Sequence, residues 1–240
     1  MRLHTEPDLA RVAGLMGEPT RAAMLASLLG GQALAAGELA RRAGVTAATA
    51  SAHLARLLES GLLTCRRSGR HRYYELANGD VAAALEALAR VAAPVAAGNP
   101  AQAKGSGELR FARTCYDHLA GKLGLLLTET MLERGLICGR TGFELTTAGD
   151  AWLVTLGIDV QALRTTRRIL ARPCMDWSER RNHLAGAAGA AIANALLERG
   201  WLARLPGTRA LRLSLRGREG LYRSLGLEIV DPATPLRKLG

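Results

Sequence analysis

Five basic side chains stand close together in the first third of the 240-residue sequence. They are Arg66, Arg67, Arg70, His71 and Arg72, five potential cations within seven residues. Such a run repels itself and gains free energy from a nearby anion, so it is typical of a surface that contacts nucleic-acid phosphates. A solvated basic hairpin is the alternative.

A second set of reactive residues lies in two related R-x-C-x-D segments of the second half. The set comprises Cys115, Asp117, His118, Cys174, Asp176 and, after a short insert, His183. Thiolates combined with imidazole or carboxylate groups ligate soft or borderline metals. Arg113 and Arg172, each two residues before a cysteine, would instead lower the thiol pKa and favour a redox sensor.

Two further interpretations of these segments stay open. The aromatic residues Tyr116, Trp152 and Trp177 would line a pocket for a small organic ligand, with Arg180 and Arg181 accepting an anionic group. Alternatively, the cysteines are buried as small apolar residues and the segments recur for packing alone. Cys65 and Cys138 are lone thiols and weaker candidates.

The elements around the basic run follow from apolar spacing and from helix-capping residues. Thr20 and Thr46 are predicted N-caps, and Gly44 is a predicted left-handed helix stop. The pattern predicts helices at 9–16, 21–29, 36–43, 46–60 and 81–92, and hairpin strands at 62–67 and 72–76 with a turn at Ser68 and Gly69.

The predicted helix 46–60 has the composition of a DNA-recognition helix. Its first turns carry small or hydroxylated residues and no acid, which permits close approach to base edges. Together with the basic run, the expected DNA contacts are Arg41, Arg42, Thr46, Ala48, Thr49, Ser51, His53 and Arg56. For His53 a structural or phosphate hydrogen bond is expected.

Composition predicts a mainly α fold with small β-hairpin wings. Hydrophobic residues make up 48% and aromatic residues 4%, so the core must consist of Leu, Ala and Val, and the net charge of +11 suits a polyanionic partner. No secretory signal opens the chain, and the apolar run 184–197 is too short for a bilayer. We expect a cytoplasmic protein with reduced thiols and no membrane partner.

Proline and glycine content divides the sequence into domains. Residues 1–92 are predicted to form a winged helix-turn-helix domain, 93–107 a linker, and 108–240 a sensor or regulatory domain. Within the last, matching segments such as Leu132–Gly135 and Leu197–Gly200 indicate a duplication, with copies at about 110–160 and 170–230. Each copy is expected to be winged-helix-like.

Several short segments in order resemble the ArsR/SmtB family of winged-helix repressors. They are Gly17–Arg21, Glu38–Ala40, Ser51–Leu54, Leu57, Glu59–Leu63 and Tyr73–Leu76, within a match over about residues 10 to 92. The resemblance implies a homodimer built from the first and fifth helices, an inverted-repeat operator in double-stranded DNA, and repression relieved by an inducer.

The usual metal sites of that family are absent from this sequence. The segment from Gln32 to Glu38 contains none of the cysteines of the thiolate site, and helix 81–92 contains none of the histidines of the dimer-interface zinc site. The cofactor and the inducer are therefore unknown at this point.

Three functions are compatible with these features. The first is a homodimeric transcriptional repressor that an inducer releases from its operator. The second is an architectural DNA-binding protein without an inducer. The third is an enzyme using Cys115 or Cys174 with His118 or His183, but the sequence lacks the common nucleotide-loop, zinc-protease and serine-hydrolase motifs, so an enzyme is not expected.

Overall fold

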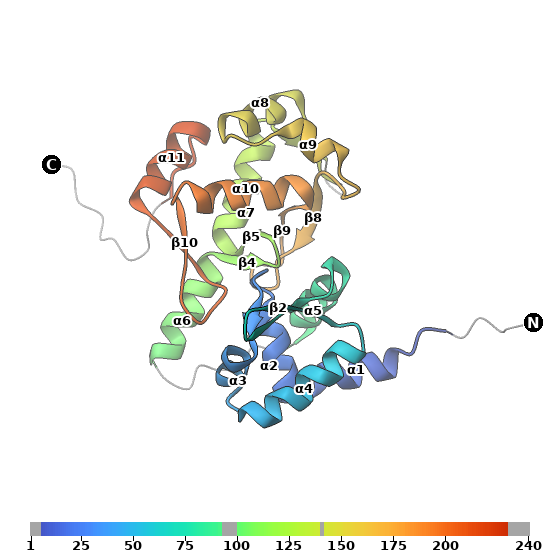
Figure 1. Cartoon of the computed structure of the whole chain (residues 1–240). Helices are drawn as coiled ribbons and strands as arrows, with labels where there is room; N and C mark the ends of the chain where they lie inside the picture. Colours follow the sequence, from blue (N-terminus) through green and yellow to red (C-terminus); the bar gives the residue numbers. More distant parts are fainter. Residues whose placement is uncertain (1–5, 93–99, 140–141, 230–240) are drawn as a thin grey trace, which may run out of the picture. The chain divides into compact units, whose positions relative to one another are not determined.

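A computed structural model describes residues 6–92, 100–139 and 142–229, and the structural statements below concern those residues. The chain divides into two compact units (Figure 1). The N-terminal unit contains residues 6–92, the C-terminal unit contains most of residues 100–229, and each has its own apolar core. None of the helices in these ranges combines the length and hydropathy of a membrane span.

The N-terminal unit is a winged helix-turn-helix. Its elements are α1 (Leu9–Gly17), α2 (Pro19–Leu28), β1 (Leu34–Ala35), α3 (Ala36–Ala43), α4 (Ala47–Glu59), β2 (Leu63–Ser68), β3 (His71–Leu76) and α5 (Gly79–Val91). The strands form an antiparallel sheet in the order β1-β3-β2. Met24, Leu39, Leu54, Leu57 and Tyr74 pack together in the apolar core of the unit.

Helix starts in this unit are partly as predicted. The Thr46 hydroxyl accepts a hydrogen bond from Thr49 N at 3.2 Å and caps α4, and Gly44 ends α3 with φ of 68°. The prediction for α2 was wrong, because Glu18 rather than Thr20 is the N-cap and accepts from the Thr20 and Arg21 amides. Pro19 suits the first helical position because its φ is fixed, which places the Glu18 carboxylate at the cap.

The hairpin and the fifth helix differ slightly from the predicted ranges. Ser68 pairs with His71, so the turn consists of Gly69 and Arg70 rather than Ser68 and Gly69. Asn78 caps α5 by accepting from two backbone amides, and the helix begins at Gly79. β1 was not predicted, because two residues are too few to show an alternating pattern.

The C-terminal unit consists of short hairpins and helices. Its elements are α6 (Pro100–Phe111), β4 (Arg113–Cys115), β5 (His118–Ala120), α7 (Gly121–Glu133), β6 (Ile137–Cys138), β7 (Glu144–Leu145), α8 (Thr147–Thr155), α9 (Val160–Thr165), β8 (Arg172–Met175), β9 (Asn182–Ala185), α10 (Gly186–Glu198), β10 (Leu202–Arg204), β11 (Leu211–Leu213) and α11 (Leu215–Leu225). A hairpin, a helix, a second hairpin and a further helix thus follow one another twice. The proposed duplication and its winged-helix-like character stay predictions.

The predicted linker 93–107 is wrong over its second half. Residues 93–99 lie outside the described part of the chain, but α6 begins at Pro100 and includes the rest of that segment. Proline is favourable at a first helical position, and the alanines, Gln102 and Lys104 are good helix formers. The segment lacks large apolar side chains, so no apolar period revealed the helix.

The two halves of the C-terminal unit pack across each other. α7 packs against β9, and α10 packs against β5. A Cβ atom added to Gly124 on α7 or to Gly189 on α10 would lie 2.6 Å from a backbone oxygen, that of Leu119 or Leu184 respectively. Glycine at both positions therefore permits each helix to pass close to the end of the strand before it, which holds the hairpins β4–β5 and β8–β9 in place.

Candidate functional site

The N-terminal half of α4 presents a smooth polar face to solvent. Thr46, Ala48, Thr49 and Ser51 are exposed, whereas the opposite face, at helical spacing, is buried through Ala50, Leu54 and Leu57. This helix therefore has one face in the core and another, without bulky or acidic groups, free for a nucleic-acid groove.

The three hydroxyls on this face already have partners within the helix. The Thr46 and Thr49 Oγ1 atoms lie 2.9 Å apart, and the Ser51 hydroxyl donates to Ala47 O at 2.9 Å. A hydroxyl has one donor and two acceptor sites, so each retains capacity for a base or phosphate. The internal bonds hold the hydroxyls in defined positions before any ligand arrives.

The basic residues of α3 and α4 differ in availability. Arg41 and Arg56 are exposed. Arg42 is half-buried, and its Nη2 lies 2.6 Å from Glu38 Oε1 in an ion pair one helical turn away. Arg41 and Arg56 are therefore better placed than Arg42 to meet phosphates.

His53 lies inside the N-terminal unit rather than on its polar face. The ring is half-buried, with Nδ1 3.3 Å from Glu18 Oε2 and 3.5 Å from Arg21 Nη1. Among the predicted DNA contacts, His53 is thus the one for which the structure favours the structural role. The pKa of Glu18 is lowered to about 2, first by the hydrogen bond from the Arg21 amide.

Arg21 is a buried structural residue that the sequence analysis missed. Its Nε donates to Leu15 O at 2.7 Å and its Nη2 donates to Gly14 O at 3.0 Å, so it binds the open carbonyl end of α1. Arg21 lies one helical turn before Met24 and Leu25, on the buried face of α2, and this spacing could have indicated from the sequence that its side chain is buried.

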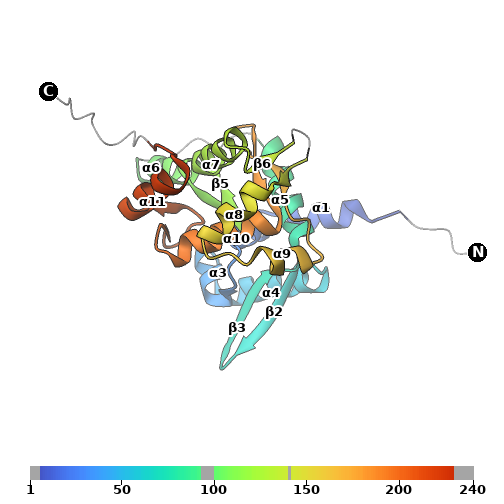
Figure 2. The same cartoon turned by 90° about the horizontal axis from the view of Figure 1, so that it is seen from above.

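The β2–β3 wing carries an exposed group of cations. Figure 2 shows the hairpin extending beyond the helices of its unit, and all five predicted basic residues on it are exposed. Arg67 stands directly opposite Arg72 in the strand register, and the Arg66 guanidinium lies 5.3 Å from the Tyr73 ring centroid. No acidic residue occurs between Cys65 and Tyr74 in the sequence, so like charges face one another across the hairpin.

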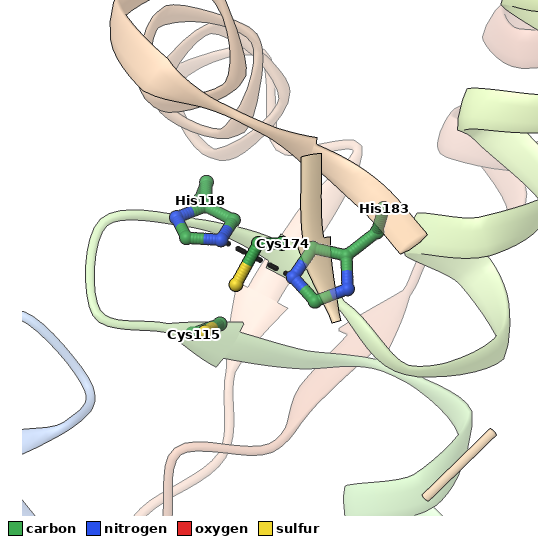
Figure 3. Close-up of side chains that lie close together, drawn as sticks. All are labelled: Cys115, His118, Cys174 and His183. Atoms are coloured by element: carbon green, nitrogen blue, oxygen red, sulfur yellow. Dashed lines mark hydrogen bonds between the residues drawn. The ribbon is translucent and has the colours of Figure 1, made fainter. Parts of the chain in front are cut away.

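Four metal-ligand side chains meet at the hairpins β4–β5 and β8–β9. Figure 3 shows Cys115 and His118 on one hairpin and Cys174 and His183 on the other. One ligand atom from each of the four lies within 4.8 Å of the other three, and the two histidine Nε2 atoms are 3.2 Å apart. Both rings and Cys115 are buried, and Cys174 is half-buried.

Two carboxylates stand behind the two imidazoles. Asp117 Oδ1 is 3.2 Å from His118 Nδ1, and Asp176 Oδ2 is 3.5 Å from His183 Nδ1, a distance that marks an electrostatic contact rather than a good hydrogen bond. Burial opposes ionisation of Asp117, but hydrogen bonds from His118 and Arg168 hold its pKa below the ordinary value. Burial also opposes a raised pKa for His118, but Asp117 and Cys174 outweigh it and raise that pKa.

Arg113 binds Asp176 rather than tuning a thiol. The guanidinium is fully buried, with Nη2 2.8 Å from Asp176 Oδ1, and its Cζ lies 4.4 Å from the Trp177 ring centroid. Burial opposes ionisation of Asp176, but the nearby Arg113 charge dominates and holds the pKa of Asp176 far below its ordinary range. Arg172, the corresponding residue of the second segment, is half-buried.

The residues predicted to line an organic-ligand pocket are used in other ways. Trp152 belongs to the apolar core, and Trp177 stacks on Arg113. Tyr116 and Arg180 have left-handed backbone angles at the hairpin turns, with φ of 59° and 57°. Arg181 pairs with Glu129. In the described residues these side chains do not line one common pocket.

Comparison with known proteins supports what the N-terminal geometry indicates. A family model described as a helix-turn-helix domain matches residues 16–66. The HTH-type transcriptional regulator YdfF of Bacillus subtilis is 40% identical over 224 residues, covering 93% of this chain and 99% of YdfF. The match therefore includes the C-terminal unit.

Other relatives match the N-terminal region alone. The HTH-type transcriptional regulator CmtR of Mycobacterium tuberculosis is 36% identical over 105 residues, which cover 43% of this chain and 88% of CmtR. The crystal structure of the transcriptional repressor BigR from Xylella fastidiosa shares 25% identity over 37% of this chain and 89% of its own, with a TM-score of 0.34. From the near full-length match, the helix-turn-helix model and the winged fold, this chain belongs to the ArsR/SmtB family of winged helix-turn-helix transcriptional regulators and is a DNA-binding regulator.

Proposed function

We propose that this regulator is a homodimeric repressor that binds an inverted-repeat operator and is released when an inducer is sensed. The observation that carries the proposal is the joint presence, in one unit, of an exposed acid-free face on α4 and an exposed arginine hairpin. In this proposal α4 enters the major groove, and the wing contacts phosphates or the adjacent minor groove.

Within α4, Thr49 is the best candidate for reading base edges. It is exposed in the first turn, and its hydroxyl is held by Thr46. Arg41, Arg56 and the wing arginines supply phosphate contacts, which position the protein without reading sequence. In this proposal the hydroxyls of α4 read the base sequence, and the guanidiniums position the protein on the DNA backbone.

Apolar side chains on α1 and α5 support the dimer. Leu88 is 50% exposed and Val91 is 82% exposed on α5, and Leu9 is 76% exposed on α1. Leu88 and Val91 are three residues apart and therefore share one side of the helix. A second copy of the chain would cover such a surface, and a dimer of this kind matches the two halves of an inverted repeat.

The dimer is tested by a double substitution, Leu88→Glu with Val91→Glu. Sedimentation should change from dimer to monomer, and affinity for an inverted-repeat duplex should fall at least tenfold, because one operator then needs two separate binding events. Leu215→Glu on α11, where the side chain is 79% exposed, is the matched control and should change neither. A variant that stays dimeric with full affinity would rule out this interface.

Repression and release are tested with a reporter gene placed behind the operator. Expression should fall when the regulator is present and recover when the inducer is supplied. Uniform coating of unrelated DNA without a preferred site would instead identify an architectural DNA-binding protein.

A further inference from the structure

The cluster of Cys115, His118, Cys174 and His183 has the geometry of a site for a single metal ion. In a tetrahedral zinc site, bond lengths of about 2.0 to 2.1 Å to nitrogen imply a nitrogen–nitrogen separation of about 3.3 Å, and bonds of about 2.3 Å to sulfur imply a sulfur–sulfur separation of about 3.8 Å. The observed Nε2–Nε2 distance is 3.2 Å, and the four ligand atoms lie within 4.8 Å of one another. Small side-chain adjustments would therefore bring all four to one ion.

The two imidazole rings of the cluster turn their Nε2 atoms toward each other and their Nδ1 atoms toward carboxylates. Asp117 Oδ1 lies 3.2 Å from His118 Nδ1, within hydrogen-bond distance of that ring nitrogen. Asp176 Oδ2, which accepts from Gly121 N at 2.8 Å, lies 3.5 Å from His183 Nδ1 and makes an electrostatic contact with that ring. The two Nε2 atoms, 3.2 Å apart, are thus left facing each other at a position that one proton or one cation can bridge.

Each carboxylate in turn is held by an arginine. Arg113 Nη2 lies 2.8 Å from Asp176, and Arg168 Nη2 lies 2.7 Å from the second oxygen of Asp117. The charges behind the cluster are therefore already compensated. A carboxylate behind each ligating imidazole is the usual outer arrangement of histidine metal sites, because it fixes the ring and raises the basicity of the ligating nitrogen.

We propose that these two cysteines and two histidines bind one Zn²⁺ ion in a closed, four-coordinate site. A set of two sulfur and two nitrogen ligands suits zinc and other soft or borderline ions rather than magnesium or calcium. On binding, both thiols become thiolates, and their protons and the proton shared by the imidazoles pass to solvent. The divalent charge and two thiolates sum to zero, so a neutral centre results, which suits a buried location.

The geometry favours an ion over the two other sensory chemistries. A disulfide between Cys115 and Cys174 would use the sulfurs but leave two buried imidazoles facing each other. For an organic ligand, the side chains first considered as a pocket lining are already used elsewhere, since Trp152 packs in the apolar core, Trp177 stacks on Arg113 and Arg181 pairs with Glu129.

The ion would join the two hairpins that carry its ligands. One cysteine and one histidine come from β4–β5, and the other two ligands come from β8–β9. Metal binding that requires the folded arrangement stabilises it, so the loaded protein should melt at a higher temperature than the chelator-treated protein. With four protein ligands the coordination is complete, which is typical of a zinc site without a catalytic water.

The test uses the full-length chain, purified under reducing conditions and titrated with Co²⁺ as a spectroscopic substitute for Zn²⁺. We expect one Co²⁺ per chain, with the absorption bands of tetrahedral cobalt and of thiolate-to-cobalt charge transfer, and displacement by Zn²⁺. Cys115→Ser and Cys174→Ser should each weaken binding at least 100-fold while circular dichroism shows an unchanged fold. Cys138→Ser, an exposed thiol outside the cluster, is the matched control and should bind like the parent.

A second variant tests the outer arrangement. Asp117→Asn should lower affinity for Zn²⁺ by about 10- to 100-fold without removing a ligand. The proposal is overturned if the parent binds no Co²⁺, if the charge-transfer band is missing, or if both serine variants bind as tightly as the parent. Since no DNA is present in this titration, its failure is distinct from failure of the proposed repressor function.

Discussion

The wing and the Cys/His cluster each place like groups next to each other. On the wing these groups are guanidinium cations exposed to solvent, and in the cluster they are imidazole nitrogens in a buried site. On the wing, Arg67 and Arg72 face each other in water. In the cluster, the Nε2 atoms of His118 and His183 face each other in a buried site. The wing needs an anion from outside the chain, and one proton or one cation can bridge the facing nitrogens of the cluster.

Exposure to solvent sets the electrostatic free-energy cost of the wing and of the cluster. Water and salt screen the exposed guanidiniums, so their mutual repulsion is weak without DNA. Phosphate contacts then lower the free energy of the wing when DNA binds. A buried site has no such screening, so its charges must be compensated when the chain folds. Arg113 and Arg168 provide that compensation behind the cluster. The wing is therefore a surface that awaits a polyanion, whereas the cluster is a preorganised site.

The strongest test of this contrast is Asp176→Asn. Removing the charge leaves Arg113 buried without its partner, which should reduce the free energy of unfolding by about 3 to 5 kcal/mol. Urea unfolding measured in EDTA checks this without any metal contribution. The matched control is Asp150→Asn, whose partner Arg164 is well exposed, and which should cost at most about 1 kcal/mol. Equal losses for the two variants would contradict the contrast between buried and exposed pairs.

On the wing, Arg70→Ala combined with Arg72→Ala should weaken binding to every DNA sequence. The loss should be at least about tenfold at moderate salt, and the slope of log affinity against log salt should decrease by about 2, since two phosphate contacts disappear. Fluorescence anisotropy over a range of salt concentrations gives both values. Arg216→Ala with Arg223→Ala on α11 is the matched control, and an unchanged slope in the wing variant would remove the wing from the interface.

A substitution on α4 should separate recognition of the base sequence from binding to the DNA backbone. Thr49→Ala should change the preferred base at one operator position by about 1 kcal/mol while leaving affinity for unrelated DNA unchanged. Binding to a panel of single-base operator variants measures this. If affinity falls equally for all members of the panel, Thr49 contacts the backbone instead.

The smallest effect concerns the half-buried carboxylate of Glu18. Its pKa is lowered to about 2 in the folded chain from the ordinary value of 4.5, because the Arg21 and Thr20 amides donate hydrogen bonds to its ionised form. A lowered folded-state pKa gives stability that is present above about pH 4.5 and is lost as the pH falls towards 2. The melting temperature of the parent should therefore fall more steeply over this interval than that of Glu18→Gln. Parallel pH profiles would show that this carboxylate contributes no pH-dependent stability.

The sequence predicted the wing well because all of its information is local. Strand alternation, the turn residues and the arginine run occupy fifteen consecutive positions, so no distant contact was needed to place them. The face of α4 was predictable for the same reason, since the buried Ala50, Leu54 and Leu57 recur at helical spacing and leave Thr49 on another face. His53 and Arg42 were harder, because their partners Glu18 and Glu38 lie on other turns or helices.

The cluster could be predicted only as a set of candidates. Its four ligands come from two hairpins far apart in the sequence, and their convergence depends on the packing of α7 against β9 and of α10 against β5. The sequence also associated Arg113 with a thiol, whereas the folded chain places it on Asp176. Repeat matching singled out these residues as candidates, and the distances between their ligand atoms are what the metal proposal adds to that.

The central claim is that α4 and the wing of a dimer read an inverted-repeat operator. Selection of bound duplexes from a random pool, followed by footprinting on the selected sequence, tests it most directly. We predict one enriched motif with two inverted half-sites about one helical turn apart, about 10 to 10.5 base pairs, protected by two chains. Protection of all duplexes alike, with no enriched motif, would contradict the claim.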